Sequence, residues 1–202
     1  AASDVYKRQI DDGANGTNRK SAVSRLKTYI QSTTSLDDLS DGKSGGTDFT
    51  GSMILGHETT GTVDAAQYNK AVGINAMDAI TTGDKNTALG YDALTAFTAG
   101  ANNLAVGYET LLTLTTGNSN IAVGANAMHY NATGSYNTAL GDGAMFYQLG
   151  NANTSVGYGA MSGSSTQANT NTGAANTSMG YKALRNNSSA DFNSAFGSQA
   201  LD

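Results

Sequence analysis

The sequence predicts a mainly β fold, a repeat solenoid or parallel β-roll of about nine coils of 17 residues, preceded by one short helix. Glycine recurs mostly every 17 residues, an apolar residue directly precedes each of these glycines, and asparagine stands four residues before most of them. A fixed period of this length is typical of a solenoid, in which each repeat buries its apolar side chains against the next. The repeat glycines are Gly56, Gly73, Gly90, Gly107, Gly124, Gly141, Gly157, Gly180 and Gly197.

Each repeat glycine ends a short segment, such as residues 87–89, that suits a strand of three or four residues. We expect the bulky residue directly before the glycine to stack into an apolar spine inside the coils. The Ala or Ser one position earlier should allow close approach of the backbone, including that of neighbouring chains. The asparagines are expected to bond along the array as a ladder. They are Asn69, Asn86, Asn103, Asn120, Asn137, Asn153, Asn176 and Asn193.

The segment after each repeat glycine carries Leu or Met four residues on and varies more than the segment before it. It fits either a second short strand or a single helical turn. Tyrosine recurs directly after the glycine, at Tyr91, Tyr108, Tyr158 and Tyr181. This column is either a surface that stacks on glycans or a half-exposed cover for the corner of the coil. The longer interval between Gly157 and Gly180 places an insertion within residues 162–175, which is either a recognition loop or an inert bulge.

Three parts of the chain are expected. Residues 1–9, AASDVYKRQ, match a translation of the transposon-end adapter used in sequencing libraries, so we treat them as an artefact and expect the natural N-terminus to be missing. Residues 10–51 are a leading segment with a short amphipathic helix over 21–31 and a linker. Residues 52–202 are the repeat array, expected to be cut at its C-terminus. The chain would then be a fragment of a metagenomic gene.

Composition argues against several classes of function. The net charge is −5 and only 13% of residues are charged, which disfavours nucleic acid as a partner. No apolar run has the roughly 18 residues of a membrane span, so no membrane insertion is expected. The chain has no cysteine, and neither His57 nor His129 has a second ligand at metal-binding spacing. No nucleophile elbow, phosphate loop or pair of carboxylates suggests catalysis, so we expect no enzyme activity, catalytic residue, metal or cofactor.

Two segments carry a family resemblance. Residues 86–94 read NTALGYDAL and residues 176–184 read NTSMGYKAL. Both resemble the NTAxGYxAL repeats of bacteriophage tail-fibre proteins, which often end in an endosialidase-type chaperone domain. The leading segment around residues 12–30 is similar to the stretch before the repeats in marine phage tail proteins. The shorter phrase at residues 103–107, NLAVG, is also similar to the head repeats of trimeric autotransporter adhesins, whose units are usually nearer 14 residues.

The phage resemblance implies a homotrimeric fibre in the virion tail that contributes to host attachment. Its partners would be copies of itself and a glycan or protein on the host surface. If the chain is trimeric, the Ala and Ser columns are expected to face the threefold axis. The alternative is the head of a trimeric autotransporter adhesin on a bacterial cell surface.

Overall fold

The computed structural model describes residues 42–44, 53–55, 66–163 and 171–202, which all belong to one compact unit, Ser40–Asp202. The adapter-like residues 1–9 and the helix expected over 21–31 lie outside the described residues. So do Gly56, His57 and residues 164–170 of the insertion. The described residues are therefore the repeat array and, from the leading segment, residues 42–44.

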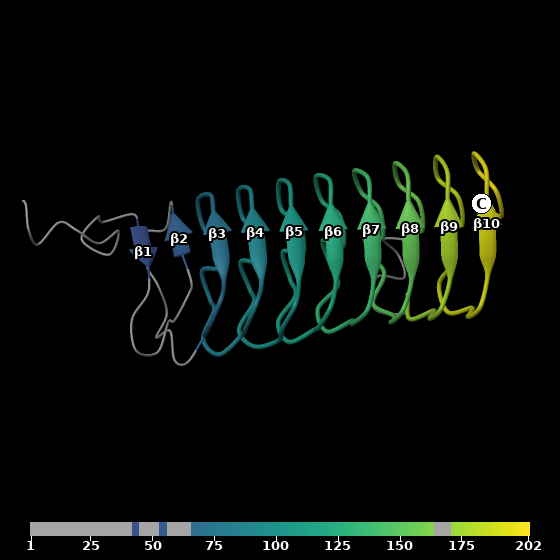
Figure 1. Cartoon of the computed structure of the whole chain (residues 1–202). Coiled ribbons are helices and arrows are strands. Elements are labelled where there is room, and N and C mark those ends of the chain that lie inside the picture. Colours follow the sequence, from purple (N-terminus) through teal and green to yellow (C-terminus); the bar gives the residue numbers. More distant parts are fainter. Residues whose placement is uncertain (1–41, 45–52, 56–65, 164–170) are drawn as a thin grey trace, which may run out of the picture. The chain divides into compact units, whose positions relative to one another are not determined.

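Ten strands of three residues each, among the residues just named, form one sheet in which neighbours in sequence are neighbours in the sheet (Figure 1). β1 pairs antiparallel with β2, and each later pair is parallel. The predicted parallel β-solenoid with a 17-residue spacing is therefore confirmed. The strands are β1 Gly42–Ser44, β2 Met53–Leu55, β3 Lys70–Val72, β4 Thr87–Leu89, β5 Leu104–Val106, β6 Ile121–Val123, β7 Thr138–Leu140, β8 Thr154–Val156, β9 Thr177–Met179 and β10 Ser194–Phe196.

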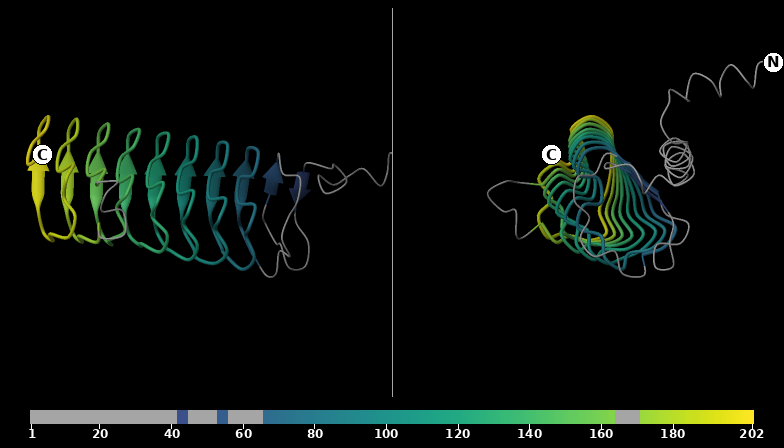
Figure 2. Two further views of the ribbon diagram at one scale, coloured as in Figure 1. Left: turned by 180° about the vertical axis from the view of Figure 1, so that it is seen from behind. Right: turned by 90° about the vertical axis from the view of Figure 1, so that its left-hand side faces the viewer.

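The register of the sheet places equivalent residues of successive repeats side by side. Ala88 of β4, for example, pairs with Ala71 of β3 and with Ala105 of β5. Each column of the aligned sequence therefore becomes a row of side chains along the array. Seen along the array, the coils lie nearly one behind another (Figure 2).

The middle residue of each strand points into the coil, and this corrects one sequence prediction. In β3–β10 the middle Ala or Ser is at most 2% exposed. The bulky residue beside the repeat glycine, which we expected inside, points outward instead: Leu89 is 49% exposed and Met179 is 47% exposed. The Ala and Ser columns are thus enclosed by their own coil, so they cannot face a threefold axis between chains.

The interior is narrow because the backbone closes around it. Small residues line the strand side, and the Leu or Met four residues after each repeat glycine from Gly73 to Gly180 fills the remaining space. These Leu and Met side chains are fully buried or nearly so. They are Met77, Leu94, Leu111, Met128, Met145, Met161 and Leu184.

A ladder of buried asparagines runs along the inside of the array. The side-chain oxygen of Asn103 accepts hydrogen bonds from the backbone N–H of Asn120 at 3.0 Å and from its side-chain amide at 3.0 Å. The amide of Asn120 also donates to the carbonyl of Gly134 at 2.8 Å. The same pattern repeats from Asn69 to Asn193 with small variations. These bonds satisfy buried polar groups that would otherwise be costly.

The segment after the repeat glycine is neither the strand nor the helical turn that the sequence left open. It is an extended turn in which backbone groups bond to the coils on both sides. Leu94 N–H, for example, donates to Thr110 O at 3.1 Å and Asp92 N–H donates to Ile74 O at 3.0 Å. Residues two and four after the glycine have positive φ, such as 54° at Asp92 and 55° at Leu94. The sequence did not indicate this conformation, because bulky residues rarely adopt positive φ.

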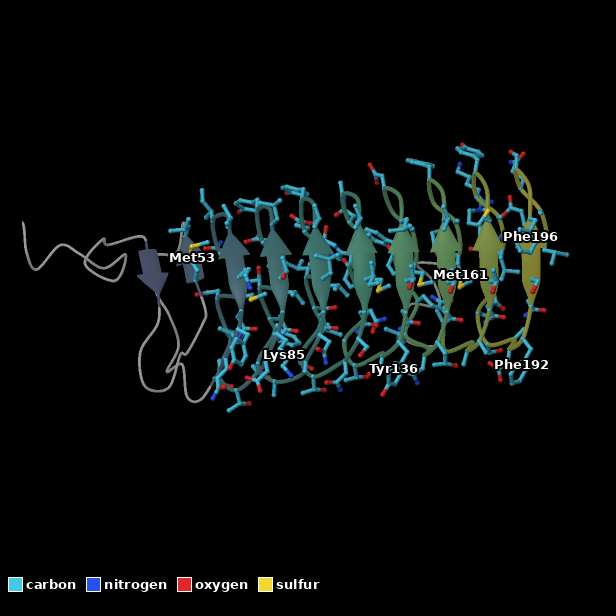
Figure 3. All side chains as sticks on the ribbon, in the orientation of Figure 1. Met53, Lys85, Tyr136, Met161, Phe192 and Phe196 are labelled. Atoms are coloured by element: carbon cyan, nitrogen blue, oxygen red, sulfur yellow. The ribbon has the colours of Figure 1, made fainter. Side chains whose placement is uncertain are left out.

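Another column with positive φ lies five residues before each repeat glycine, where the chain turns into the strand. Lys85, Tyr136 and Phe192 project from this corner (Figure 3), with φ values of 56°, 62° and 58°. Tyr136 and Phe192 are strongly exposed. The corner therefore displays variable side chains on a backbone that is the same in every coil.

Candidate functional site: the outer sheet face and a hollow between coils

The outer face of the sheet consists of the first and third residues of strands β3–β10, because the middle residue points inward. The third residues are Val72, Leu89, Val106, Val123, Leu140, Val156, Met179 and Phe196, and the first residues are Lys70, Thr87, Leu104, Ile121, Thr138, Thr154, Thr177 and Ser194. Lys70 is the only charged residue in this set. The outer face is thus an exposed to half-buried, nearly uncharged surface, and at the usual strand spacing its eight strands span roughly 35 Å.

The four predicted recognition tyrosines lie in two separate pairs at the corner next to the outer face. Tyr91 and Tyr108 stack with ring centroids 5.4 Å apart, and Tyr158 and Tyr181 stack at 5.6 Å. All four rings are about half exposed. In the two coils between the pairs this column does not carry tyrosine, so the stripe is interrupted.

An aromatic cluster lies further along the turn, five and six residues after Gly124 and Gly141. His129 stacks on Phe146 with centroids 4.9 Å apart, and Tyr130 stacks on Tyr147 at 5.1 Å. Edge-to-face contacts join the two stacks. The aromatic cluster is therefore packed across two adjacent coils, and His129 is its most buried ring.

His129 also lies beside a carboxylate from the preceding coil. Its Nδ1 is 3.5 Å from Oε2 of Glu109, a proximity that 17-residue stacking creates between residues 20 apart in sequence. Burial lowers the pKa of His129 because it disfavours the imidazolium, and the negative charge of Glu109 opposes part of this effect. Glu109 raises the pKa of Tyr108 through a side-chain hydrogen bond and through its charge.

The lowered pKa of His129 predicts a pH dependence of stability. The unfolded chain, where His titrates at about 6.5, binds this proton more readily than the folded chain does, so folding stability falls as the pH drops through that value. We expect a lower thermal unfolding midpoint at pH 5 than at pH 7.5. The His129→Phe variant, which keeps a ring against Phe146, should show a smaller difference. An equal difference in both proteins would show that His129 does not contribute.

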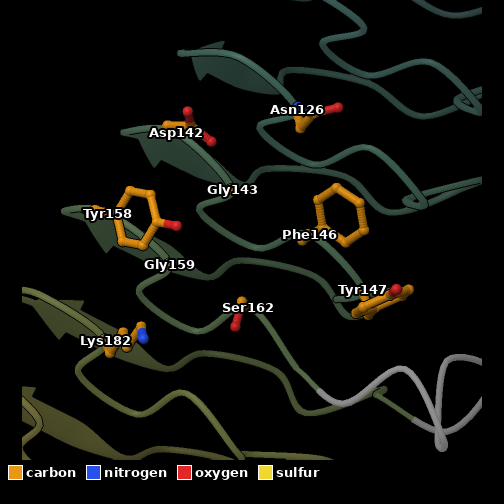
Figure 4. Close-up of a pocket in the computed structure, with 9 residues that line it drawn as sticks. All are labelled: Asn126, Asp142, Gly143, Phe146, Tyr147, Tyr158, Gly159, Ser162 and Lys182. Carbon is orange, nitrogen blue, oxygen red and sulfur yellow. The ribbon is translucent and has the colours of Figure 1, made fainter.

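Between these aromatic groups the surface has a hollow of about 320 Å³ (Figure 4). Gly143 and Gly159 form its floor. Tyr158 and Asp142 lie on one side of the floor, and Phe146 on the other. We call this feature the hollow. Its volume is at the small end of the range of about 300–1,000 Å³ that ligand pockets occupy.

Tyr147 lies beside Phe146 in the hollow, and Asn126, Ser162 and Lys182 complete its lining. The Lys182 ammonium lies 5.0 Å from the centroid of the Tyr181 ring. The carboxylate of Asp142 is exposed and makes no hydrogen bond or ion pair with the described part of the chain. Aromatic faces and free polar groups therefore meet in one place.

Among the residues of the hollow, sequence reasoning singled out only Tyr158 and, as the first residue of the insertion, Ser162. The signal that it missed is a set of departures from the repeat. The position two after the repeat glycine carries a side chain in most coils but is glycine at Gly143 and Gly159. The position six after it is Ala or Thr in earlier coils but tyrosine at Tyr130 and Tyr147. These departures fall in adjacent coils, and Gly143, Gly159 and Tyr147 line the hollow.

Across 66–163 and 171–202, no three His, Asp or Glu side chains gather as a metal site would require. No helix with the length and apolar character needed to cross a membrane occurs within the described ranges.

Comparison of the chain with protein-family models, with curated proteins and with solved structures finds no match. The structural conclusion is thus a parallel β-solenoid of 17-residue repeats, and its function has to be argued from its surfaces.

Proposed function

We propose that this chain is a structural segment of a phage tail fibre that trimerises through the outer face and contributes to host attachment from the virion tail. The supporting observation is the outer face itself: the exposed or half-buried Val, Leu, Met and Phe side chains beside the repeat glycines form a continuous apolar row, and Lys70, in the neighbouring row, is the single charge on this face. Large exposed apolar patches mark interaction sites in soluble proteins. The threefold symmetry and the phage assignment come from the resemblance of the repeats.

A second copy of this chain fits the outer face better than an unrelated partner does. Every coil presents the same kind of residue at the same place, so the surface is periodic along the array. Identical copies arranged about a common axis match that period in every coil, and closed symmetry is the usual arrangement of homo-oligomers. We therefore propose that the trimer interface is formed by the third residues of strands β3–β10, directly before the repeat glycines, and not by the buried Ala and Ser residues in the middle of each strand.

The head of a trimeric autotransporter adhesin is the second candidate. The phrase at residues 120–124, NIAVG, is similar to the repeats of those heads, and they also associate as three copies. The sequence flanking this reading frame in its gene distinguishes the two candidates. Phage structural genes nearby support the fibre, whereas a membrane anchor encoded downstream supports the adhesin.

Introducing charges on the outer face should abolish self-association. We expect the full chain to sediment as a trimer and the double variant Leu89→Lys, Leu140→Lys to sediment as a monomer. Burying each Leu is worth roughly 1.5–3 kcal/mol, and a lysine there would have to be desolvated. The sheet itself tolerates lysine, since Lys70 occupies an outer-face position. Sedimentation equilibrium measures the mass.

The matched control is the double variant Thr116→Lys, Thr133→Lys. Both threonines are exposed and lie on the segment that returns from the turn to the next strand. This variant should remain trimeric. A parent chain that stays monomeric at high concentration, or two double variants that dissociate equally, would contradict the assigned interface.

A further inference from the structure

The hollow lies where several departures from an otherwise regular repeat converge. In the preceding coil the side chain of Asn126 occupies the position of Gly143 on the same kind of backbone, with φ of 56° against 63°, whereas the next coil repeats the glycine, at Gly159. A tyrosine occupies the position of Asp142 in four other coils. A repeat array needs no such changes for its own stability, because identical coils stack equally well. Several residues that differ from the repeat and line the same hollow therefore indicate a binding site there.

The backbone at the floor of the hollow is already paired. Gly143 N–H donates to Ala125 O at 2.9 Å, and Gly159 N–H donates to Asp142 O at 2.9 Å. An extended peptide could not add to this surface as a strand, because strand addition needs free backbone donors and acceptors. Recognition at the hollow must therefore come from side chains.

The side chains that are available combine two kinds of contact. Tyr158 offers an exposed ring, and Phe146 and Tyr147 offer partly exposed rings on the other side of the floor. On the same side as Tyr158 lie the free carboxylate of Asp142 and the ammonium of Lys182. A purely apolar ligand would desolvate these charged groups without compensation. A ligand that fits the hollow therefore combines an apolar surface with groups that donate and accept hydrogen bonds.

We propose that the hollow binds one saccharide unit of a glycan, with the sugar ring between the walls formed by Tyr158 and Phe146. One face of a pyranose carries C–H groups, which are attracted to the negative face of an aromatic ring. Its hydroxyls both donate and accept hydrogen bonds, so they can pair with Asp142, Asn126 and Lys182. This inference rests on the proposed role in host attachment and names the class of receptor that this role requires.

The test uses the full chain and four probes: the methyl glycosides of glucose, galactose, N-acetylglucosamine and rhamnose. Saturation-transfer NMR should show binding of at least one probe, with transfer strongest to the C–H groups on one face of its ring. Gly143→Asn places in the hollow the side chain that Asn126 carries in the preceding coil. A Cβ at Gly143 meets no atom within 4 Å, so the fold should be retained. We expect the affinity of that probe to fall by about tenfold, because the asparagine side chain would push the sugar away from one of the two rings.

A matched pair of variants separates the hollow from the tyrosine corner. Tyr158→Ala removes a ring that lines the hollow, and Tyr91→Ala removes a ring from the equivalent stack elsewhere in the column. Only Tyr158→Ala should weaken binding. Absence of binding of all four probes to the parent, unchanged affinity in Gly143→Asn, or equal loss in both tyrosine variants would overturn the proposal.

Sedimentation of the same samples keeps this inference distinct from the fibre proposal. If the chain is trimeric but binds none of the four glycosides, the proposed saccharide site is wrong and the fibre proposal stands. If the chain is monomeric, binds a glycoside and no longer binds it after Gly143→Asn, the saccharide site is supported and the proposed trimer is wrong.

Discussion

The Gly107→Ala variant is expected to lose roughly 3 kcal/mol or more of its free energy of unfolding, with a matching fall in the urea midpoint measured by circular dichroism. Gly107 has φ of 140°, which is accessible in practice only to glycine. A Cβ there would also lie 2.6 Å from the carbonyl oxygen of Gly124 in the next coil. Backbone strain and a steric clash therefore act together, and the spacing between coils cannot relax at one corner alone.

Gly143→Ala is the control for this prediction. Gly143 also has positive φ, 63°, but an added Cβ would meet no atom within 4 Å. Only the cost of a left-handed backbone remains, about 1 kcal/mol. If both alanine variants lose the same stability, the close approach of coils at the repeat glycines is not what requires glycine there.

The Asn120→Ala variant should lose about 3–5 kcal/mol, since it leaves two buried backbone groups without partners. The N–H of Asn137 bonds to Oδ1 of Asn120 at 3.1 Å, and the carbonyl of Gly134 accepts from Nδ2 of Asn120 at 2.8 Å. Asn120 is fully buried, so water cannot replace these bonds without opening the coil. Urea unfolding of the variant and of the parent measures the difference.

Asn118 provides the comparison two residues away. Its Oδ1 accepts a hydrogen bond from the N–H of Ala101 at 2.8 Å, but the side chain is exposed. Water can take its place, so Asn118→Ala should cost about 0.5 kcal/mol or less. Equal losses in the two variants would mean that the buried ladder does not stabilise the array more than an exposed asparagine does.

The strands and their register could be predicted because the same sequence pattern recurs in every repeat. The strand expected at residues 87–89 is β4, and the 17-residue period gives the register of the parallel sheet. Which side of the strand faces inward could not be read as easily. In a three-residue strand, Ala88 and its neighbour Leu89 point to opposite faces, and size alone suggested that Leu89 was inside.

The deciding factor is the width of the coil. A narrow interior admits Ala88 on the strand side because Leu94, from the turn, already occupies the space. The turn itself was not predictable, since Leu94 adopts a positive φ that its residue type disfavours. The hollow was not predicted for another reason. Aligning the repeats identifies the positions that are the same in every coil, whereas the hollow is formed by residues that differ from the repeat, such as Gly143 and Tyr147.

Copies of this chain are proposed to associate through the outer face. The chain has no cysteine, so a single spin label can be placed at Val123→Cys on the outer face, or at Thr116→Cys on the returning segment as a comparison. Packed sheets lie about 10 Å apart. Electron paramagnetic resonance should therefore show strong dipolar broadening between labels at position 123 and weak or no broadening at position 116. Broadening that is absent at position 123, or equal at both positions, would contradict the account.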